Sequence, residues 1–415
     1  MVHQVVYRTL HIGSHGTGEY WNGIIDEVRI SNVARTDGWI KTTYYNQDPA
    51  TTFYTLGPIA TYRSIGTNSD TLYDTGAASI STDSTTVTFS GGASLPAPDA
   101  VGAIGQGDKL TIDPGGANEE EFFILSRDSD SQVTVQAAAT ADHTGESYTI
   151  KRAYNTIQAW ENPVASNGRG GDLVNENRLE IGVCYKDGAF NELVNIQDNT
   201  TDATRYMWLT VAEGQRHDGT AGSGVIWQNS VDKNDRVLQI RDPFTRIEWI
   251  EFDGSNMPSG DYDVVSCQAG GDTAHINNVI AHDLTGDYIN AFEFWSGGAN
   301  SRLENCIAYD VSGTGSGIVV VNVSGVEIDN CTFYNTSVRG VDNRTSATIV
   351  KNTISMNATG DDFYGTYAAG SDYNMSSDAG APGSDIDSGT TASGTTTATV
   401  KLDDTSGLSA GDWFN

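Results

Sequence analysis

The chain has 415 residues, enough for two or three domains, and a formal charge of −31 from 54 acidic and 23 basic residues. This balance argues against nucleic acid as a partner, because phosphate binding relies on Lys and Arg to release counterions. It also argues against unaided binding of polyanionic sugars. The 46 glycines and the lack of long helical patterns indicate a β-rich chain with many turns, and no apolar run is long enough to span a membrane.

Residues 1–57 include the strand pattern GIIDEVRI at 23–30, with Asn22-Gly23 as a turn signal at its start. AR follows at 34–35, WI at 39–40 and YNQ at 45–47. On these residues the stretch resembles the C-terminal part of a concanavalin/laminin-G-like jelly-roll module. It is too short to close a two-sheet sandwich of roughly a hundred residues, so we expect only that part here.

Residues 58–154 alternate apolar and polar residues in five short runs: TTVTF, DKLTI, EEFFIL, QVTVQ and SYTIKR. Turn-forming residues such as Asp113-Pro114-Gly115-Gly116 separate these runs. The pattern predicts a small β barrel or sandwich. The stretch TATVKLDDTSGLSAGDWFN echoes it weakly, so we expect residues 386–415 to start a second small β module that is truncated.

A short helix is predicted next, because Ile157, Trp160 and Pro163-Val164 could cover one face. A Gly-rich turn and a strand ending at Tyr185 follow. The segment resembles the N-terminal cap of pectin-lyase-like right-handed β-helices, where such a helix covers the open end of the core.

One short phrase then recurs four times, as HINNVIAHD, RLENCIAYD, EIDNCTFYN and IVKNTISMN. Its last residues are Asp283, Asp310, Asn335 and Asn357, at intervals of 27, 25 and 22. A second phrase lies between the copies, as NAFEFWSG, SGIVVVNVSG and RGVDNRTSA. Similar strands joined by loops of variable length are typical of a solenoid.

Stacked coils would align equivalent residues of each copy. One apolar ladder would contain Ile276, Leu303, Ile328 and Val350. An Asn ladder at a turn would contain Asn278, Asn305, Asn330 and Asn352, since Asn tolerates left-handed backbone and its amide can replace lost backbone hydrogen bonds. A one-residue slip would reverse which face is buried, so the coils are better determined than the facing of any residue.

With the closing phrase SDYNMSSDAGAPG at 371–383, these repeats resemble bacterial secreted right-handed parallel β-helix proteins of the pectin-lyase-like type over residues 155–385. The resemblance implies an all-β fold and an extracellular or cell-surface location, with the export signal outside this chain. The same solenoid hosts lyases, hydrolases, epimerases, adhesins and phage tailspikes, so the fold alone does not name a function.

Enzymes of this fold use the outer face of one strand in each coil. If Phe292 and its equivalents point inward, Glu293 and Asp342 point outward, two coils and roughly 10 Å apart. This separation is near that of acid and base in an inverting glycosidase, although Val319 lies between them. Arg339, beside Asp342, is the nearest counterpart of the Arg in pectate-lyase-type enzymes, and no complete catalytic motif is present.

Trp295, Tyr364 and Tyr367 are candidates for an aromatic strip that stacks on sugar rings. The expected partner is therefore a polysaccharide or cell-surface glycan. We expect a secreted or cell-surface modular protein with a non-catalytic role in carbohydrate binding, in adhesion or as a structural stalk. The alternatives are a polysaccharide lyase or glycoside hydrolase of the β-helix class, and a trimeric fibre like a phage tailspike.

No cofactor is required by this reading, but structural Ca²⁺ is a candidate. Asp283 and Asp310 are expected to stack in one column, with Asp253 before them, and like charges about 5 Å apart repel. A hard cation with oxygen ligands would relieve this repulsion, as would salt or a raised carboxyl pKa.

Overall fold

The computed structural model describes residues 14–15, 19–20, 33–36, 57–165, 171–228, 230, 236–257, 260, 263–345, 347–378 and 380–383. Residues 1–56 form a unit of their own, in which the short strands β1 (Ser14–His15) and β2 (Glu19–Tyr20) pair antiparallel. The expected jelly-roll part at 1–57 lies almost wholly outside the described residues. The expected β module at 386–415 lies entirely outside them.

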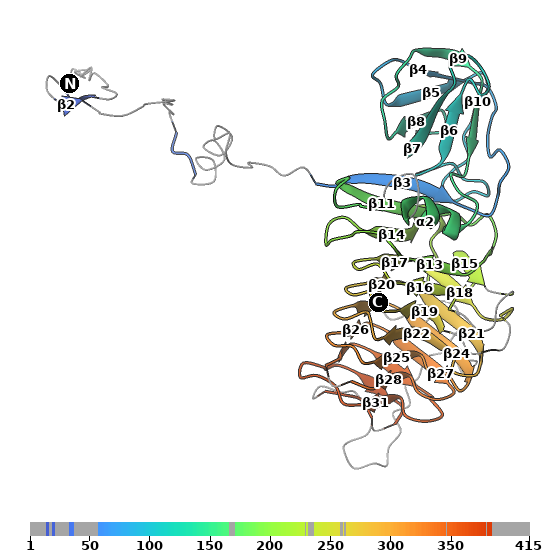
Figure 1. Cartoon of the computed structure of the whole chain (residues 1–415). Coiled ribbons are helices and arrows are strands. Elements are labelled where there is room, and N and C mark those ends of the chain that lie inside the picture. Colours follow the sequence, from blue (N-terminus) through green and yellow to red (C-terminus); the bar gives the residue numbers. More distant parts are fainter. Residues whose placement is uncertain are drawn as a thin grey trace, which may run out of the picture. The chain divides into compact units, whose positions relative to one another are not determined.

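The unit from residue 57 onward is built on three parallel sheets that stack coil upon coil (Figure 1). Sheet 1 runs in the order β29 (Ile349–Lys351), β26 (Glu327–Asp329), β23 (Arg302–Glu304), β20 (His275–Asn277), β17 (Arg246–Glu248), β14 (Met207–Val211), β11 (Arg178–Cys184) and β3 (Ile59–Ile65). Sheet 2 runs β12 (Phe190–Asn191), β15 (Val225–Gln228), β18 (Ile250–Asp253), β21 (Ile280–Gly286), β24 (Ile307–Gly313), β27 (Thr332–Thr336), β30 (Ile354–Met356) and β32 (Met375–Ser376). Sheet 3 runs β13 (Val194–Ile196), β16 (Leu238–Ile240), β19 (Asp263–Cys267), β22 (Asn290–Trp295), β25 (Ile318–Val321), β28 (Val341–Asn343) and β31 (Phe363–Gly365).

The register of these sheets confirms the predicted apolar ladders. In sheet 1, Ile276 pairs with Leu303, which pairs with Ile328, which pairs with Val350. In sheet 3 the inward column comprises Phe292, Ile318, Val341 and Phe363. All of these side chains are buried in one continuous core inside the coils, so burial repeats at every coil.

The turn from sheet 1 to sheet 2 contains the predicted Asn ladder. Asn278, Asn305, Asn330 and Asn352 all have left-handed backbone, with φ between 49° and 54°. Each backbone N–H donates to a carbonyl of the next coil, for example from Asn278 to Glu304 at 3.1 Å. In the preceding coil Trp249 occupies this position, also with left-handed backbone at φ 64°. The ladder thus preserves the backbone hydrogen bonds where each coil bends.

A separate antiparallel sheet is inserted between β3 and the rest of the β-helix. Its order is β10 (Tyr148–Lys151), β6 (Lys109–Ile112), β7 (Glu120–Ser129), β8 (Gln132–Val135), β5 (Thr86–Ser90), β4 (Ala77–Ile80) and β9 (His143–Glu146). We expected one module from 58 to 154 and the β-helix from 155. The structure instead places β3 in the β-helix, because Ile59–Ile65 pair in parallel with Arg178–Cys184 of β11.

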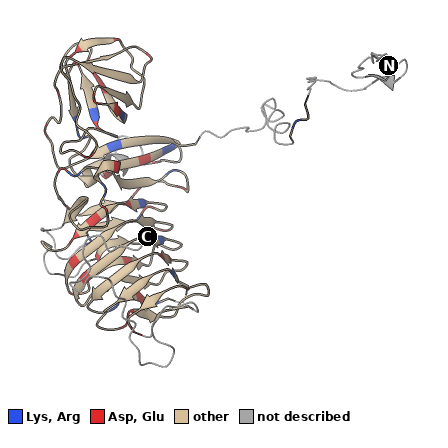
Figure 2. Ribbon diagram, turned by 180° about the vertical axis from the view of Figure 1, so that it is seen from behind, with Lys and Arg blue, Asp and Glu red and all other residues tan. Residues whose placement is uncertain are grey.

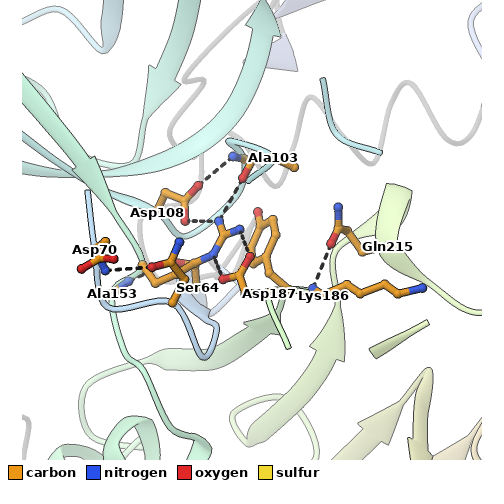
Figure 3. A network of polar contacts seen from close by, with 12 residues as sticks. Ser64, Asp70, Ala103, Asp108, Ala153, Lys186, Asp187 and Gln215 are labelled. Carbon is orange, nitrogen blue, oxygen red and sulfur yellow. Dashed lines mark hydrogen bonds and ion pairs between the residues drawn. The ribbon is translucent and has the colours of Figure 1, made fainter. Parts of the chain in front are cut away.

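A buried arginine joins the antiparallel sheet to the β-helix through two acids, Asp108 and Asp187, which Figure 3 labels. Arg152 follows β10 and donates to Asp187 Oδ2 at 2.7 Å and to Asp108 Oδ1 at 2.8 Å. Its guanidinium also lies 3.7 Å from the centre of the Tyr185 ring. Because Asp187 and Tyr185 follow β11 while Asp108 precedes β6, one side chain ties both parts together.

Helix α2 (Ile157–Ala165) covers the first coil, as predicted, with Ile157 and Trp160 fully buried. Glu192 accepts hydrogen bonds from the N–H groups of Ile157 and Gln158 and thereby caps the helix. Two further buried carboxyls are Glu161, on the helix itself, and Asp242, which follows β16. Burial raises the pKa of Glu161 to about 7 and that of Asp242 to about 6.

The raised pKa values of these two carboxyls predict that the stability of the fold depends on pH. A carboxyl whose pKa is higher in the folded than in the unfolded chain stabilises the fold below its unfolded pKa, and this contribution is lost as pH rises through the folded pKa. The free energy of unfolding should therefore fall between about pH 4.5 and 7, with Glu161 contributing on the order of 3 kcal/mol. Glu161→Gln should flatten this slope in urea titrations across pH, whereas the exposed Glu213→Gln should not. An unchanged slope in Glu161→Gln would contradict the assignment.

Candidate functional site

The outer face of sheet 3 carries the residues that the sequence proposed for catalysis. Its register aligns Ser266, Glu293, Val319, Asp342 and Tyr364 in one column. Glu293 and Asp342 therefore lie on the same face, two strands apart, with Val319 between them as expected. Parallel strands spaced about 4.8 Å apart put their α-carbons roughly 10 Å from each other.

Two arginines donate hydrogen bonds to the Asp342 carboxylate. Arg339 donates to its Oδ2 at 2.9 Å and Arg344 donates to the same atom at 2.7 Å. Asp342 is completely buried, whereas the Arg344 side chain is half-exposed. Two cationic donors on one buried carboxylate hold it in a fixed position, which suits a structural anchor.

Glu293 is also buried, and one of its carboxylate oxygens has three donors. Its Oε2 accepts from Ser266 Oγ at 2.6 Å, from Gln268 Nε2 at 2.9 Å and from Arg236 Nε at 3.5 Å. The carboxyl of Asp263 lies beside it, and burial together with the charge of Glu293 raises the pKa of Asp263 well above its usual range. The Asp263 carboxyl therefore keeps its proton to higher pH than a solvated aspartate does.

Asp263 was missed by sequence reasoning. It stands at the start of β19 and pairs with Asn290, whose Nδ2 donates to it at 2.7 Å. Only the strand register brings it next to Glu293, one coil away, and no local pattern near Asp263 indicates that register. Its proximity gives Glu293 a partner different from the predicted Asp342.

The predicted aromatic strip is present in part. Trp295 and Tyr364 are each 42% exposed and project from the outer face of sheet 3, on β22 and β31. The guanidinium of Arg339 lies 3.5 Å from the centre of the Tyr364 ring and fixes its plane. Tyr367 instead packs against Phe363 in the core, and its hydroxyl donates to backbone oxygens, so it does not extend the strip.

The three acids proposed for Ca²⁺ lie at the outer edge of sheet 2, where acidic residues recur along the coils (Figure 2). Asp283 stacks on Asp310 as predicted, because their flanking residues pair in register. The placement of Asp253 in the same column was wrong. Asp253 pairs with His282, and Gly254 takes the position opposite Asp283.

The His282 ring lies between the carboxylates of Asp283 and Glu251. Its Nδ1 lies 2.7 Å from Asp283 Oδ2 and its Nε2 lies 3.0 Å from Glu251 Oε1. Although burial opposes protonation, the hydrogen bonds to these two carboxylates raise the pKa of His282 above its ordinary value. Asp253, His282 and Asp283 also form the group of described residues whose ligand atoms lie within 4.8 Å of one another, whereas Asp310 is outside it.

Asp342 provides a test of its structural role. Asp342→Asn leaves Arg339 and Arg344 without their counter-charge and should lower the free energy of unfolding by about 2–4 kcal/mol, measured by urea titration. The neighbouring Asp361 is exposed, and Asp361→Asn should cost less than about 0.5 kcal/mol. Equal stability of the two variants would show that the arginines do not depend on Asp342.

The expected calcium site can be tested by comparing melting temperatures in two salts of equal ionic strength. Millimolar CaCl₂ should raise the melting temperature by about 2–4 °C over NaCl of equal ionic strength, because a cation bridging Asp283 to its acidic neighbours binds only the folded chain. Asp283→Asn should abolish this difference. Equal midpoints in the two salts would mean that charge screening alone acts and that no calcium site exists.

Among the described residues, no helix is long and apolar enough to cross a membrane. The family model described as right-handed β-helix region matches residues 249–394. No curated protein matches the chain. Since the parallel sheets agree with the family match, the coils form a right-handed parallel β-helix.

Three solved structures are distantly similar. The tailspike protein gp49 from Pseudomonas phage LKA1 is 12% identical over 77% of this chain and 44% of that chain, with a TM-score of 0.16. The catalytic domain of a GH87 alpha-1,3-glucanase in complex with nigerose is 11% identical over 73% of each chain, with a TM-score of 0.19. The Gp54 tailspike of Acinetobacter baumannii bacteriophage AP22, in complex with A. baumannii capsular saccharide, is 9% identical over 78% of this chain and 63% of that chain, with a TM-score of 0.15.

The chain spans less than half of the LKA1 tailspike that it matches. The family match and the three parallel sheets together establish the architecture: this is an all-β protein whose principal domain is a right-handed parallel β-helix.

Proposed function

We propose that the β-helix binds a carbohydrate on its outer surface without chemically changing it. The observation that carries the proposal is the pair of exposed aromatic side chains, Trp295 and Tyr364, on one face of sheet 3. Aromatic rings offer an apolar face to the C–H groups of a sugar ring, while their polar edges stay hydrated. Their strands are three coil spacings apart, which places the rings roughly 14 Å from each other along the axis.

The side chains around these rings suit a glycan. Arg344 lies half-exposed between β22 and β31 and offers guanidinium donors to sugar hydroxyls, while Asp342 beneath it balances one positive charge. Arg339 holds the Tyr364 ring against rotation, so little side-chain freedom is lost on binding. The face therefore combines fixed stacking surfaces with hydrogen-bond donors.

The carboxylates of the same face favour binding over catalysis. An inverting glycosidase needs an acid and a base that both reach the scissile bond, with room for a water between them. Here Asp342 is completely buried under two arginines, Glu293 is engaged by Ser266 and Gln268, and Val319 fills the space between them. We accordingly favour a secreted or surface-displayed adhesin or stalk whose partner is a polysaccharide or cell-surface glycan.

A second candidate is a glycoside hydrolase or lyase that uses different residues. It is favoured by the raised pKa of Asp263, which keeps a proton available beside the Glu293 carboxylate. This pair would require access to a substrate, yet both side chains are more than nine-tenths buried. We therefore rank it below binding.

A glycan array, followed by titration of the best ligand, tests the proposal. Trp295→Ala and Tyr364→Ala should each weaken binding about tenfold, because each removes one stacking surface. Tyr373→Ala is the matched control, since Tyr373 is 61% exposed but lies in a turn outside sheet 3. Release of reducing ends or of an unsaturated product, abolished by Asp263→Asn, would instead establish the enzyme.

A further inference from the structure

A polar groove of about 540 Å³ runs along the outer edge of sheet 2, away from the aromatic pair. Four successive coils contribute the same short motif to this edge, an Asp or Asn followed two residues later by a Ser or Thr. The copies are Asp283 with Thr285, Asp310 with Ser312, Asn335 with Ser337, and Asn357 with Thr359. All of these residues except Asn357 line the groove.

The first residue of each motif is held rigidly. Asp283, Asp310, Asn335 and Asn357 all have left-handed backbone, with φ between 53° and 62°. Asn335 Nδ2 donates to Asp310 Oδ1, and Asn357 Nδ2 donates to Asn335 Oδ1 at 3.3 Å. These bonds between coils set the amides and carboxylates in a line, each one coil spacing from the next.

The hydroxyls form a second line beside the first. Thr285 Oγ1 and Ser312 Oγ lie 2.8 Å apart, and Ser312 also donates to the carbonyl of Leu284 at 3.0 Å. Thr285, Ser312 and Thr359 are exposed and Ser337 is half-buried. Within the described residues, Thr359 Oγ1 makes no side-chain hydrogen bond, so part of the line is available to a ligand.

Both aspartates of the groove already have a hydrogen-bond partner. The His282 ring lies 2.7 Å from Asp283 Oδ2, and Asp310 accepts from the Asn335 amide. The far half of the groove, from Asn335 to Thr359, is neutral. An anionic ligand would still meet the field of a chain with a net charge of −31, whereas a neutral ligand with hydroxyls could bond to every coil.

We infer that this groove binds an extended, uncharged polysaccharide lying parallel to the axis of the β-helix, with about one sugar per coil. Strands recur about every 4.8 Å along the axis. An extended chain of pyranose rings joined through equatorial bonds advances by nearly the same distance per sugar, so each sugar meets an equivalent pair of polar side chains. The inference rests on the proposed function in taking a glycan as ligand, and it adds a second site and a ligand class.

Calorimetric titration with β-1,4-linked xylose, glucose and mannose oligosaccharides of increasing length tests it on the full chain. Affinity should rise with each sugar up to about four, one per coil, and then level off. Ser312→Trp should lower affinity at least about tenfold by filling the exposed groove. Thr88→Trp is the matched control, because Thr88 is also an exposed strand hydroxyl that donates to a neighbouring strand's carbonyl; it should change affinity less than about twofold.

The outcomes separate the two proposals. Binding that survives Ser312→Trp but is lost in Trp295→Ala and Tyr364→Ala would overturn the groove and leave the proposed function intact. Preference for oligogalacturonate or for glucosamine oligomers over the uncharged chains would overturn the ligand class. No binding by any of the three uncharged series would overturn the inference, and if the glycan array is also blank the proposed function falls with it.

Discussion

Each strand of the β-helix finds its backbone partners one coil away, and the rest of the structure depends on this constraint. Because the partner is the equivalent strand of the next coil, whatever a coil presents must be compatible with a near copy of itself about 4.8 Å away. Apolar side chains meet this condition readily, as the column from Ile276 to Val350 shows. The turns between sheets satisfy the same condition because Asn adopts left-handed backbone there, and neighbouring coils can then exchange hydrogen bonds through the turn.

Charged side chains meet the same condition only with help. The Asp283 and Asp310 column is relieved by the His282 ring and by the amide of Asn335. Asp342 is relieved by two arginines, and Glu293 by Arg236 together with the neutral donors Ser266 and Gln268. In each case the carboxylate is stabilised by groups from the same coil or from coils at most two away, so repetition of acids is tolerated without a rise in free energy at every turn.

How far the sequence predicts this structure follows from which contacts are local. The four-fold phrase predicts the coils and the apolar and Asn ladders, and the second phrase predicts the outward facing of Glu293 and Asp342, because the repeats supply their own register. It does not predict that β3 opens sheet 1, since the partner strand lies beyond a whole inserted domain. Asp253 and Tyr367 were misplaced for a related reason: a shift of one residue at the irregular end of a repeat changes what a side chain touches. The Asp263–Glu293 pair depends on long-range register alone, and neither residue indicates it locally.

The insertion of the antiparallel sheet between β3 and β11 bears on the order of folding. Coils between β17 and β30 close loops of roughly 25 residues, whereas Ile59 must find Arg178 across about 120, which costs on the order of 1–2 kcal/mol more in chain entropy. The inserted sheet has its own hydrophobic core and shortens this search once it has folded. Arg152 can bury its charge only when both Asp108 and Asp187 are in place, so its burial belongs to the last step. We therefore infer that folding nucleates in the later coils and that the first coil in the sequence closes last.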